Sequence, residues 1–284
     1  MADVINWYPG HMAKAKREIE GQLRLVDIVL ELRDARIPFS SSNPMINEIC
    51  GNKKRLILLC KSSLADKEIT SKWIKYYNDN GISCLDIDSI TGRNINLIVK
   101  KCYECLKETF EKRKAKGIVS KEIKAMVLGI PNVGKSTLIN KLSKRKATKT
   151  GDKPGVTKNN TWIKVTEDLY LLDTPGILWP RFDNEAVGKN LSLCFGIRDE
   201  IVNLEDIAHF AIDYIKVNYK GYLNKRYNIN DDNDSLTILK DIALNRGYLN
   251  SGIPDVKKAA LTLINEIRDN KVGEMSFERP SEFI

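Results

Sequence analysis

The sequence predicts an α/β nucleotide-binding fold followed by a smaller all-helical domain. Residues 129–137 read Gly-Ile-Pro-Asn-Val-Gly-Lys-Ser-Thr and stand between an apolar strand and a helical stretch, which is the context of a phosphate-binding loop. Residues 169–176 form a second apolar strand that ends in Asp-Thr-Pro-Gly. The last third of the chain shows apolar residues at the three- and four-residue spacing of helices. We therefore expect a nucleotide domain at residues 1–180 and a helical domain at 181–284.

Short apolar runs bounded by polar residues predict buried strands in the first domain. They occur at residues 27–32, 56–60, 84–87, 125–128 and 169–172. A helix is expected at 138–142, directly after the phosphate loop. In the second domain, apolar periodicity predicts helices at 204–216, 236–244 and 256–267, and the polar, acidic residues 230–235 predict a connecting loop.

The phosphate loop predicts that the chain binds a nucleoside triphosphate with its Mg²⁺. Glycines in such a loop let backbone amides close around the phosphates. The Lys135 ammonium supplies a fixed positive charge to the β and γ phosphates, and the Ser136 hydroxyl can ligate the metal. The loop residues expected to contact the nucleotide are Asn132, Val133, Gly134, Lys135, Ser136 and Thr137.

The order of the motifs is inverted relative to an ordinary Ras-like nucleotide switch. Residues 56–66 resemble a degenerate form of the strand and Asn-Lys-x-Asp loop that read guanine, and residues 88–92 (Asp-Ser-Ile-Thr-Gly) resemble the second base-contacting loop. Both precede the phosphate loop, whereas residues 154–157 and 169–176, which resemble switches I and II, follow it. The domain is therefore similar to a circularly permuted P-loop GTPase, a rearrangement that compact domains tolerate because their ends often lie close together. The resemblance adds Lys61, Ser62, Asp88, Ser89 and Gly176 to the expected nucleotide contacts.

Two further motifs narrow this resemblance. Residues 7–15 read Trp-Tyr-Pro-Gly-His-Met-Ala-Lys-Ala and residues 34–38 read Asp-Ala-Arg-Ile-Pro. Both are similar to the opening signatures of the bacterial ribosome-assembly GTPases called RbgA or YlqF, and the likeness continues more weakly beyond residue 179. It implies a GTP hydrolase that binds the rRNA of the immature large (50S) ribosomal subunit and is released when GTP becomes GDP and phosphate.

Phosphoryl transfer needs positioned groups and neutralised charge more than covalent chemistry. Ras-like enzymes place a water-orienting glutamine after the switch II glycine, but here that residue is Ile177, whose hydrocarbon side chain cannot polarise water. His11 lies in a Pro-Gly loop before a helix and occupies the position that the resemblance marks as catalytic. Histidine is the residue type suited to proton transfer near neutral pH. The alternative is that His11 packs in the loop or contacts RNA. The expected catalytic residues are His11, Lys135 and Thr157, and the expected Mg²⁺ ligands are Ser136, Thr157 and Asp173.

Asn132 resembles the loop asparagine of potassium-activated GTPases. There the side-chain carbonyl helps to hold K⁺ against the phosphates, in the space that an arginine finger fills in other enzymes. The resemblance therefore implies K⁺ as a second cofactor. The alternative is that the Asn132 side chain only fixes the local turn through its own hydrogen bonds.

The guanine-reading motif departs from the expected pattern. In place of Asn-Lys-x-Asp the chain has Cys60-Lys61-Ser62-Ser63, so the lysine remains but the carboxylate that pairs with guanine is missing. Guanine selectivity is consequently expected to be weak, because polar pairing of this kind supplies much of the discrimination. Asp66 is a candidate replacement, and the backbone amide near Ser89 a candidate donor to guanine O6.

Three classes of function therefore remain open. The first is a GTP-hydrolysing assembly factor for the large ribosomal subunit. The second is a nucleoside triphosphatase of relaxed base specificity, which the absent carboxylate favours. The third is a nucleotide-dependent RNA-binding module with little hydrolysis, which Ile177 favours and the intact Lys135 opposes.

The charge of the chain is distributed unevenly. Residues 1–180 contain 32 Lys and Arg against 20 Asp and Glu, whereas residues 181–284 contain 14 against 17. A field of one sign attracts polyanions, which favours RNA as a partner of the basic first domain. No apolar run reaches the roughly 18 residues that span a bilayer, and the start has no apolar signal core, so we expect a cytoplasmic protein without a membrane partner. The six cysteines, which lack a second pair at zinc-ligand spacing, are expected to be buried thiols.

Overall fold

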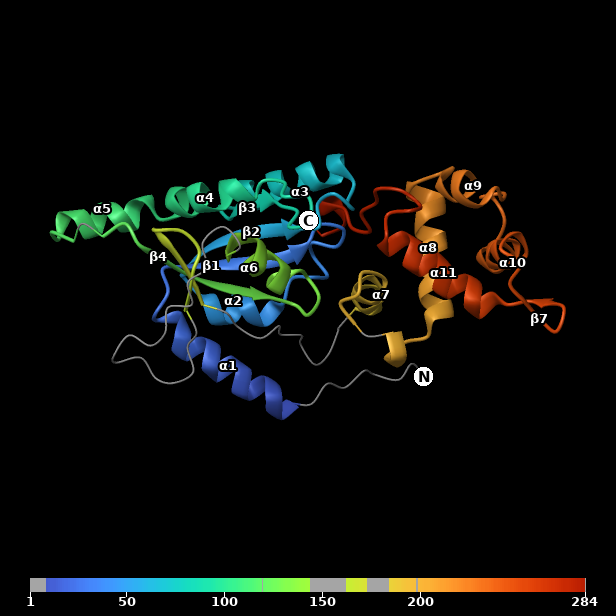
Figure 1. Cartoon of the computed structure of the whole chain (residues 1–284), viewed down its shortest axis with the longest axis horizontal. Coiled ribbons are helices and arrows are strands. Elements are labelled where there is room, and N and C mark those ends of the chain that lie inside the picture. The colour runs from blue at the N-terminus through green and yellow to red at the C-terminus, as the bar shows by residue number, and fades with distance from the viewer. Residues whose placement is uncertain (1–8, 119, 144–161, 173–183, 198, 284) are drawn as a thin grey trace.

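The computed structural model describes residues 9–118, 120–143, 162–172, 184–197 and 199–283. A six-stranded sheet flanked by helices occupies one end of the elongated molecule, and a group of helices formed by the last third of the chain occupies the other (Figure 1). Within the described ranges, no helix combines the length and apolar character needed to cross a membrane.

The sheet has the strand order β3-β2-β1-β4-β6-β5. Its strands are β1 (Ile28–Asp34), β2 (Lys54–Cys60), β3 (Ser83–Asp86), β4 (Ile123–Gly129), β5 (Trp162–Lys164) and β6 (Leu169–Leu172). All neighbouring strands are parallel except β5, which pairs antiparallel with β6. The five strands predicted from apolar runs are confirmed. The edge strand β5 was missed because its three residues are all half-buried and form no continuous apolar run.

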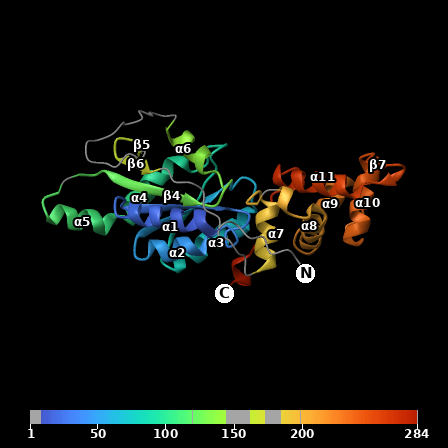
Figure 2. The same ribbon diagram turned by 90° about the horizontal axis from the view of Figure 1, so that it is seen from below.

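Helices cover both faces of the sheet because alternate strand residues point to opposite sides. On one face, Val29 of β1 packs with α1 (Pro9–Leu23) and α2 (Pro44–Cys50), and Ile57 of β2 packs with α3 (Lys67–Asp79). On the other face, Leu30, Leu58 and Val127 pack with α4 (Ile98–Cys105) and α6 (Lys135–Ser143). Figure 2 shows α1, α2 and α3 together on one side and α6 on the other. Helix α5 (Lys107–Ala115) extends from α4.

Most of the described residues in the last third of the chain form helices. This part of the chain contains α7 (Glu185–Leu193), α8 (Leu204–Asn218), α9 (Tyr222–Tyr227), α10 (Ser235–Asn245) and α11 (Val256–Arg268), with the hairpin β7 (Leu249–Asn250) and β8 (Ile253–Pro254). Single 3₁₀ turns occur at Ile95–Leu97, Asp199–Ile201 and Pro280–Glu282. The three helices predicted here are confirmed. Each starts where a side-chain oxygen of Asn203, Asp234 or Asp255 accepts a hydrogen bond from a first-turn amide.

The cysteines are buried or half-buried, as the sequence predicts, and His209 contacts a neighbouring helix. Five thiols are buried and Cys105 is half-buried, and none forms a disulfide. Among the described residues, no cluster of His, Cys, Asp and Glu side chains could hold a metal ion. His209 on α8 lies with its Nδ1 atom 2.8 Å from the Ser235 hydroxyl at the start of α10.

The C-terminal segment after α11 returns to the sheet half of the molecule. The amide of Phe277 donates to the Arg36 carbonyl over 2.8 Å, and the Trp73 indole of α3 donates to the Glu278 carbonyl over 3.1 Å. The ring of Phe283 stacks on Phe39 with the centroids 4.0 Å apart. Residues far beyond 180 therefore contact the predicted nucleotide domain, whose boundary at residue 180 stays a prediction.

Glu278 is the most deeply buried carboxyl group of this contact, with 1% of its surface exposed. Its oxygens accept hydrogen bonds from the amides of Phe39 and Ser40 and from the side chain of Asn190, over 2.6, 2.9 and 3.1 Å. Burial raises the pKa of the Glu278 carboxyl to about 7, although these hydrogen bonds lower it. The folded protein therefore binds the Glu278 proton more tightly than the unfolded chain does.

This shift predicts a loss of stability as the pH rises. The contribution of Glu278 is complete below its unfolded pKa of 4.5 and is lost as the pH rises through about 7, a change of about 3 kcal/mol in the free energy of unfolding. Urea denaturation between pH 5 and pH 8 measures it. Because the amide in Glu278→Gln cannot ionise, the stability of that variant should fall less than that of the wild type. If the stability of the wild type and of Glu278→Gln changed equally with pH, Glu278 would not be the group that causes the loss.

Candidate nucleotide-binding site

Three of the predicted nucleotide-binding loops lie at carboxyl ends of parallel strands. Residues 61–66 follow β2, residues 87–92 follow β3, and the phosphate loop begins at Gly129, the last residue of β4. The Asp-Ala-Arg segment begins at Asp34, the last residue of β1, and lies at the same edge of the sheet. Carboxyl ends of parallel strands meet at one edge of a sheet, which is where open α/β sheets bind their ligands. The structure therefore brings the predicted phosphate and base contacts to a common edge.

The phosphate loop has the backbone geometry that its glycines predict. A Cβ atom on Gly129 would lie 2.9 Å from the Leu32 carbonyl oxygen of β1, so only glycine allows this close approach of the strands. Asn132 and Gly134 have positive φ angles of 58° and 110°. Helix α6 begins at Lys135, three residues earlier than predicted, so its first-turn amides lie directly after the loop. A helix start in this position favours bound anions.

The other predicted loop residues differ in exposure. Val133 is 1% exposed and packs in the core, so its expected contribution to nucleotide binding is through the backbone. The side chains of Ser136 and Thr137 lie on exposed residues of the first turn of α6. Both hydroxyls are therefore accessible to a ligand at the helix start.

Asn132 connects the phosphate loop to the helical half. Its side-chain nitrogen donates to the Phe195 carbonyl over 3.0 Å. Phe195 follows α7, and the Arg268 guanidinium of α11 lies 3.6 Å from the centre of its ring. Arg268 also donates to the Ser192 and Leu193 carbonyls. Because the Asn132 contact uses the amide nitrogen, it is compatible with a cation at the amide oxygen.

Lys61 on the base side is oriented by a buried carboxylate. Its Nζ atom lies 3.0 Å from Oδ2 of Asp34, which is 1% exposed and also accepts bonds of 3.0 and 2.9 Å from Arg36. Burial would raise the pKa of the Asp34 carboxyl, but the charges of Arg36 and Lys61 outweigh it and hold that pKa far below its ordinary value. The Asp-Ala-Arg segment, which the sequence indicated only as part of the family resemblance, therefore positions Lys61.

The loops after β2 and β3 are joined by hydrogen bonds. The Ser62 amide donates to the Ile87 carbonyl over 3.1 Å, and the Ser63 hydroxyl lies 2.5 Å from Oδ2 of Asp88. The Ser62 hydroxyl is buried and has no hydrogen-bond partner in the described part of the chain. Ser89 is half-buried beside this contact. The predicted base-side residues Lys61, Ser62, Asp88 and Ser89 thus lie on two adjoining loops.

Asp66, the candidate replacement for the missing guanine-reading carboxylate, makes structural contacts instead. It caps the start of α3, where its Oδ1 atom accepts bonds of 2.8 and 3.1 Å from the amides of Glu68 and Ile69. Its Oδ2 atom accepts a 3.3 Å bond from the Tyr219 hydroxyl of the helical half. Both oxygens of Asp66 are therefore engaged in structural contacts.

Four predicted site residues cannot be placed by side chain. Thr157, Asp173 and Gly176 lie outside the described residues. His11, which was expected in a loop before a helix, instead belongs to the first turn of α1, and its side chain is outside the described part of the structure. Of the expected Mg²⁺ ligands, the described part of the chain thus contains Ser136 only.

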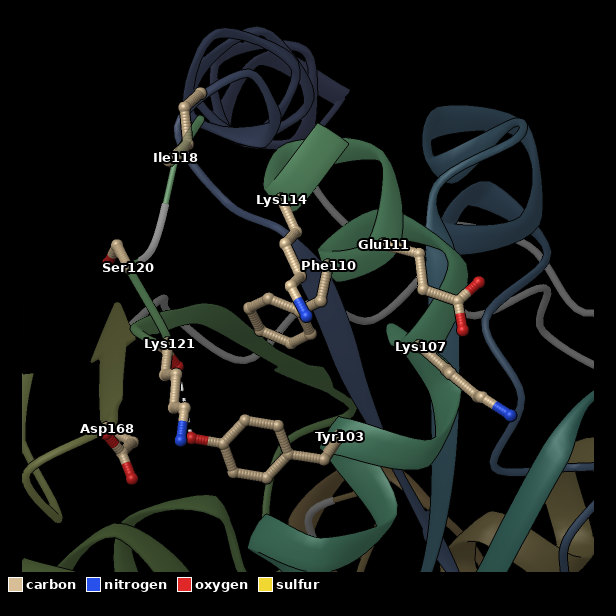
Figure 3. A pocket seen from close by; sticks show the side chains of 9 residues that line it. All are labelled: Tyr103, Lys107, Phe110, Glu111, Lys114, Ile118, Ser120, Lys121 and Asp168. Carbon is tan, nitrogen blue, oxygen red and sulfur yellow. Dashed lines mark hydrogen bonds between the residues drawn. The ribbon is translucent and has the colours of Figure 1, made fainter. Parts of the chain in front are cut away.

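A cavity of about 780 Å³ lies at the opposite edge of the sheet (Figure 3). Tyr103 of α4 and Phe110 of α5 point into it, and Lys121 and Asp168 border it near the amino ends of β4 and β6. The phosphate loop leaves β4 at its carboxyl end. This cavity is therefore separate from the candidate nucleotide site.

Comparisons with known proteins identify the family to which this chain is similar. A family model described as "50S ribosome-binding GTPase" matches residues 124–243. The chain is 46% identical over 282 residues to ribosome biogenesis GTPase A of Bacillus cereus, covering 99% of this chain and 95% of that protein. It is 48% identical to ribosome biogenesis GTPase A of Priestia megaterium, covering 98% of each. A crystal structure of GNP-bound YlqF from T. maritima has 29% identity and a TM-score of 0.68, covering 94% of this chain and 98% of that one.

Proposed function

Because this chain belongs to the ribosome biogenesis GTPase A family, we propose that it hydrolyses GTP as an assembly factor of the large ribosomal subunit. The observation that supports this function best is the phosphate loop between β4 and α6, within a chain that matches GTPases of that name over nearly its full length. The reaction converts GTP to GDP and phosphate. At the finer level, the protein binds rRNA of the immature subunit, acts in the cytoplasm and leaves after hydrolysis.

The proposed nucleotide domain is a circularly permuted GTPase. Support comes from the sheet, in which β4 and its phosphate loop stand between β1 and β6. The loops proposed to read the base follow β2 and β3, and so precede the phosphate loop along the chain while sharing its edge of the sheet. Motif order would then be preserved in space although it is changed in sequence.

Two cations complete the proposed chemistry. Mg²⁺ would be held by Ser136, Thr157 and Asp173 and would neutralise charge on the β and γ phosphates. K⁺ would be held by the side-chain oxygen of Asn132, whose nitrogen is occupied by the Phe195 carbonyl. Lys135 at the start of α6 would hold the same phosphates with the loop amides.

We expect His11→Ala to lower ribosome-stimulated GTP turnover by about 10²-fold or more while nucleotide affinity stays unchanged, because general acid–base groups contribute on this scale. The motivation is Ile177, which leaves the usual water-orienting position without a polar group. Single-turnover hydrolysis and equilibrium GTP binding measure the two quantities. His209→Ala is the matched control, because that histidine contacts Ser235 between α8 and α10. Equal turnover in both variants would reject the role of His11.

The function itself is tested by measuring turnover and affinity for GTP, ATP and XTP in potassium buffer, with and without large ribosomal subunits. The proposal predicts hydrolysis that prefers GTP and is stimulated by the subunits. Equal use of ATP would instead indicate a relaxed triphosphatase, for which the missing Asn-Lys-x-Asp carboxylate at Ser63 is the specific argument. Tight binding without turnover would indicate a nucleotide-dependent binding module.

A further inference from the structure

Ser63 stands where the resemblance expects a carboxylate that pairs with guanine. Its hydroxyl oxygen lies 2.5 Å from Oδ2 of Asp88, which belongs to the loop after the neighbouring strand β3. Ser63 is half-buried and Asp88 is 2% exposed. The last position of the Asn-Lys-x-Asp motif is therefore a serine, but this serine is hydrogen-bonded to the carboxylate of Asp88.

The direction of this hydrogen bond follows from the other contacts of Asp88. Its Oδ1 atom accepts bonds of 2.8 and 2.9 Å from the amides of Ile90 and Thr91. Burial would raise the pKa of the Asp88 carboxyl, but the bonds from Ser63, Thr91 and Ile90 hold that pKa below its ordinary value. Asp88 is therefore an ionised acceptor at neutral pH, and the proton between the two side chains belongs to Ser63.

This arrangement deepens the proposed GTPase function, on which it rests. We propose that Ser63 and Asp88 together replace the missing carboxylate, with the Ser63 oxygen accepting hydrogen bonds from guanine and Asp88 acting as its positioning residue. A free hydroxyl both donates and accepts, so it cannot distinguish the N1–H donor of guanine from the N1 acceptor of adenine. With its proton held by Asp88, Ser63 presents only lone pairs, which favour guanine.

Asp88→Asn is the informative substitution because it reverses the direction of the hydrogen bond between Ser63 and residue 88. The Ile90 and Thr91 amides still require an acceptor, so they hold the amide oxygen of the new side chain and turn its nitrogen toward Ser63. That nitrogen can only donate. The Ser63 oxygen must then accept a hydrogen bond from this nitrogen, which leaves the hydroxyl proton free to point at the base. There the proton would face the N1–H donor of guanine, which is unfavourable, but could be donated to the N1 acceptor of adenine.

The experiment measures equilibrium affinities for GTP, ATP and XTP in the full chain with Mg²⁺ and K⁺. We expect the wild type to prefer GTP and Asp88→Asn to lose about tenfold in that preference over ATP, the effect of one hydrogen bond of reversed polarity. Asp86→Asn is the matched control. Its carboxylate lies on the same chain segment but contacts Arg93 and Asn94, so the preference should be retained.

A second variant keeps the test decisive if Asp88→Asn fails to fold. The exchange Ser63→Asp with Asp88→Ser returns the carboxylate to the motif position and should retain or increase the preference for GTP. An unchanged GTP-to-ATP ratio in folded Asp88→Asn, or a lost preference in the folded exchange variant, would overturn the inference while leaving the GTPase function intact. A wild type that fails to bind GTP would overturn both.

Discussion

Replacing Lys135 with alanine is expected to lower kcat/KM for GTP by on the order of 10³-fold, or about 4 kcal/mol of transition-state stabilisation. Lys135 is the first residue of α6, where the helix start and the loop amides converge on the proposed phosphate position. Charge spreads over the transferred phosphoryl group in the transition state, so the ammonium contributes most when hydrolysis occurs. Steady-state phosphate release in the presence of large ribosomal subunits measures the loss.

Lys124→Ala provides the control for this experiment. Lys124 is the second residue of β4, so its substitution removes one positive charge, as Lys135→Ala does, but at the end of β4 opposite to the phosphate loop. Turnover in this variant should match that of the wild type, and circular dichroism should show that both variants are folded. A Lys135→Ala enzyme within threefold of wild-type turnover would show that the phosphate loop is not the site of hydrolysis.

The second large effect is expected for Asp34→Ala. This substitution leaves the guanidinium of Arg36, which is only 3% exposed, without its carboxylate, and the loss of one partner of a buried ion pair costs about 3–5 kcal/mol of stability. It also releases Lys61, whose Nζ atom bonds to the same carboxylate. Urea denaturation should therefore show a lower free energy of unfolding, and binding measurements should show weaker GTP affinity.

Glu185→Ala is a suitable comparison for Asp34→Ala. Glu185 forms a 2.7 Å ion pair with Lys189 on the surface of α7, and its side chain is 77% exposed. Solvent and salt screen such pairs, so the unfolding midpoint should not change measurably. If Asp34→Ala unfolded at the same urea concentration as Glu185→Ala, the buried cluster would not have the structural role assigned to it.

Much of the fold could be predicted because five of the six strands of the large sheet are short, apolar and mostly buried. The run at 125–128, for example, became β4 with one added residue at its carboxyl end and two at its amino end. The three long helices of the last third were predictable from their apolar periodicity. Helix α5 was not, because its nine residues include no buried side chain and therefore show no apolar face.

Within the site, local motifs were predictable and distant partners were not. The sequence identified Lys61 and Asp88, but nothing in its spacing showed that Asp34 would hold the first or that Ser63 would bond to the second. These contacts depend on which parallel strands become neighbours. Asp66 was a candidate base contact because of its proximity in sequence, and the structure shows it capping α3, a role that depends on where that helix begins.

The late return of the C-terminal segment has a consequence for biosynthesis. Phe39 and Glu278 are hydrogen-bonded although they are separated by 239 residues, and the same segment bonds to Arg36 and Leu64, beside the loops that follow β1 and β2. At a translation rate of about 5–20 residues per second, the early loops wait on the order of 10–50 s for these contacts. A nascent chain therefore cannot form these contacts until residue 278 has been synthesised.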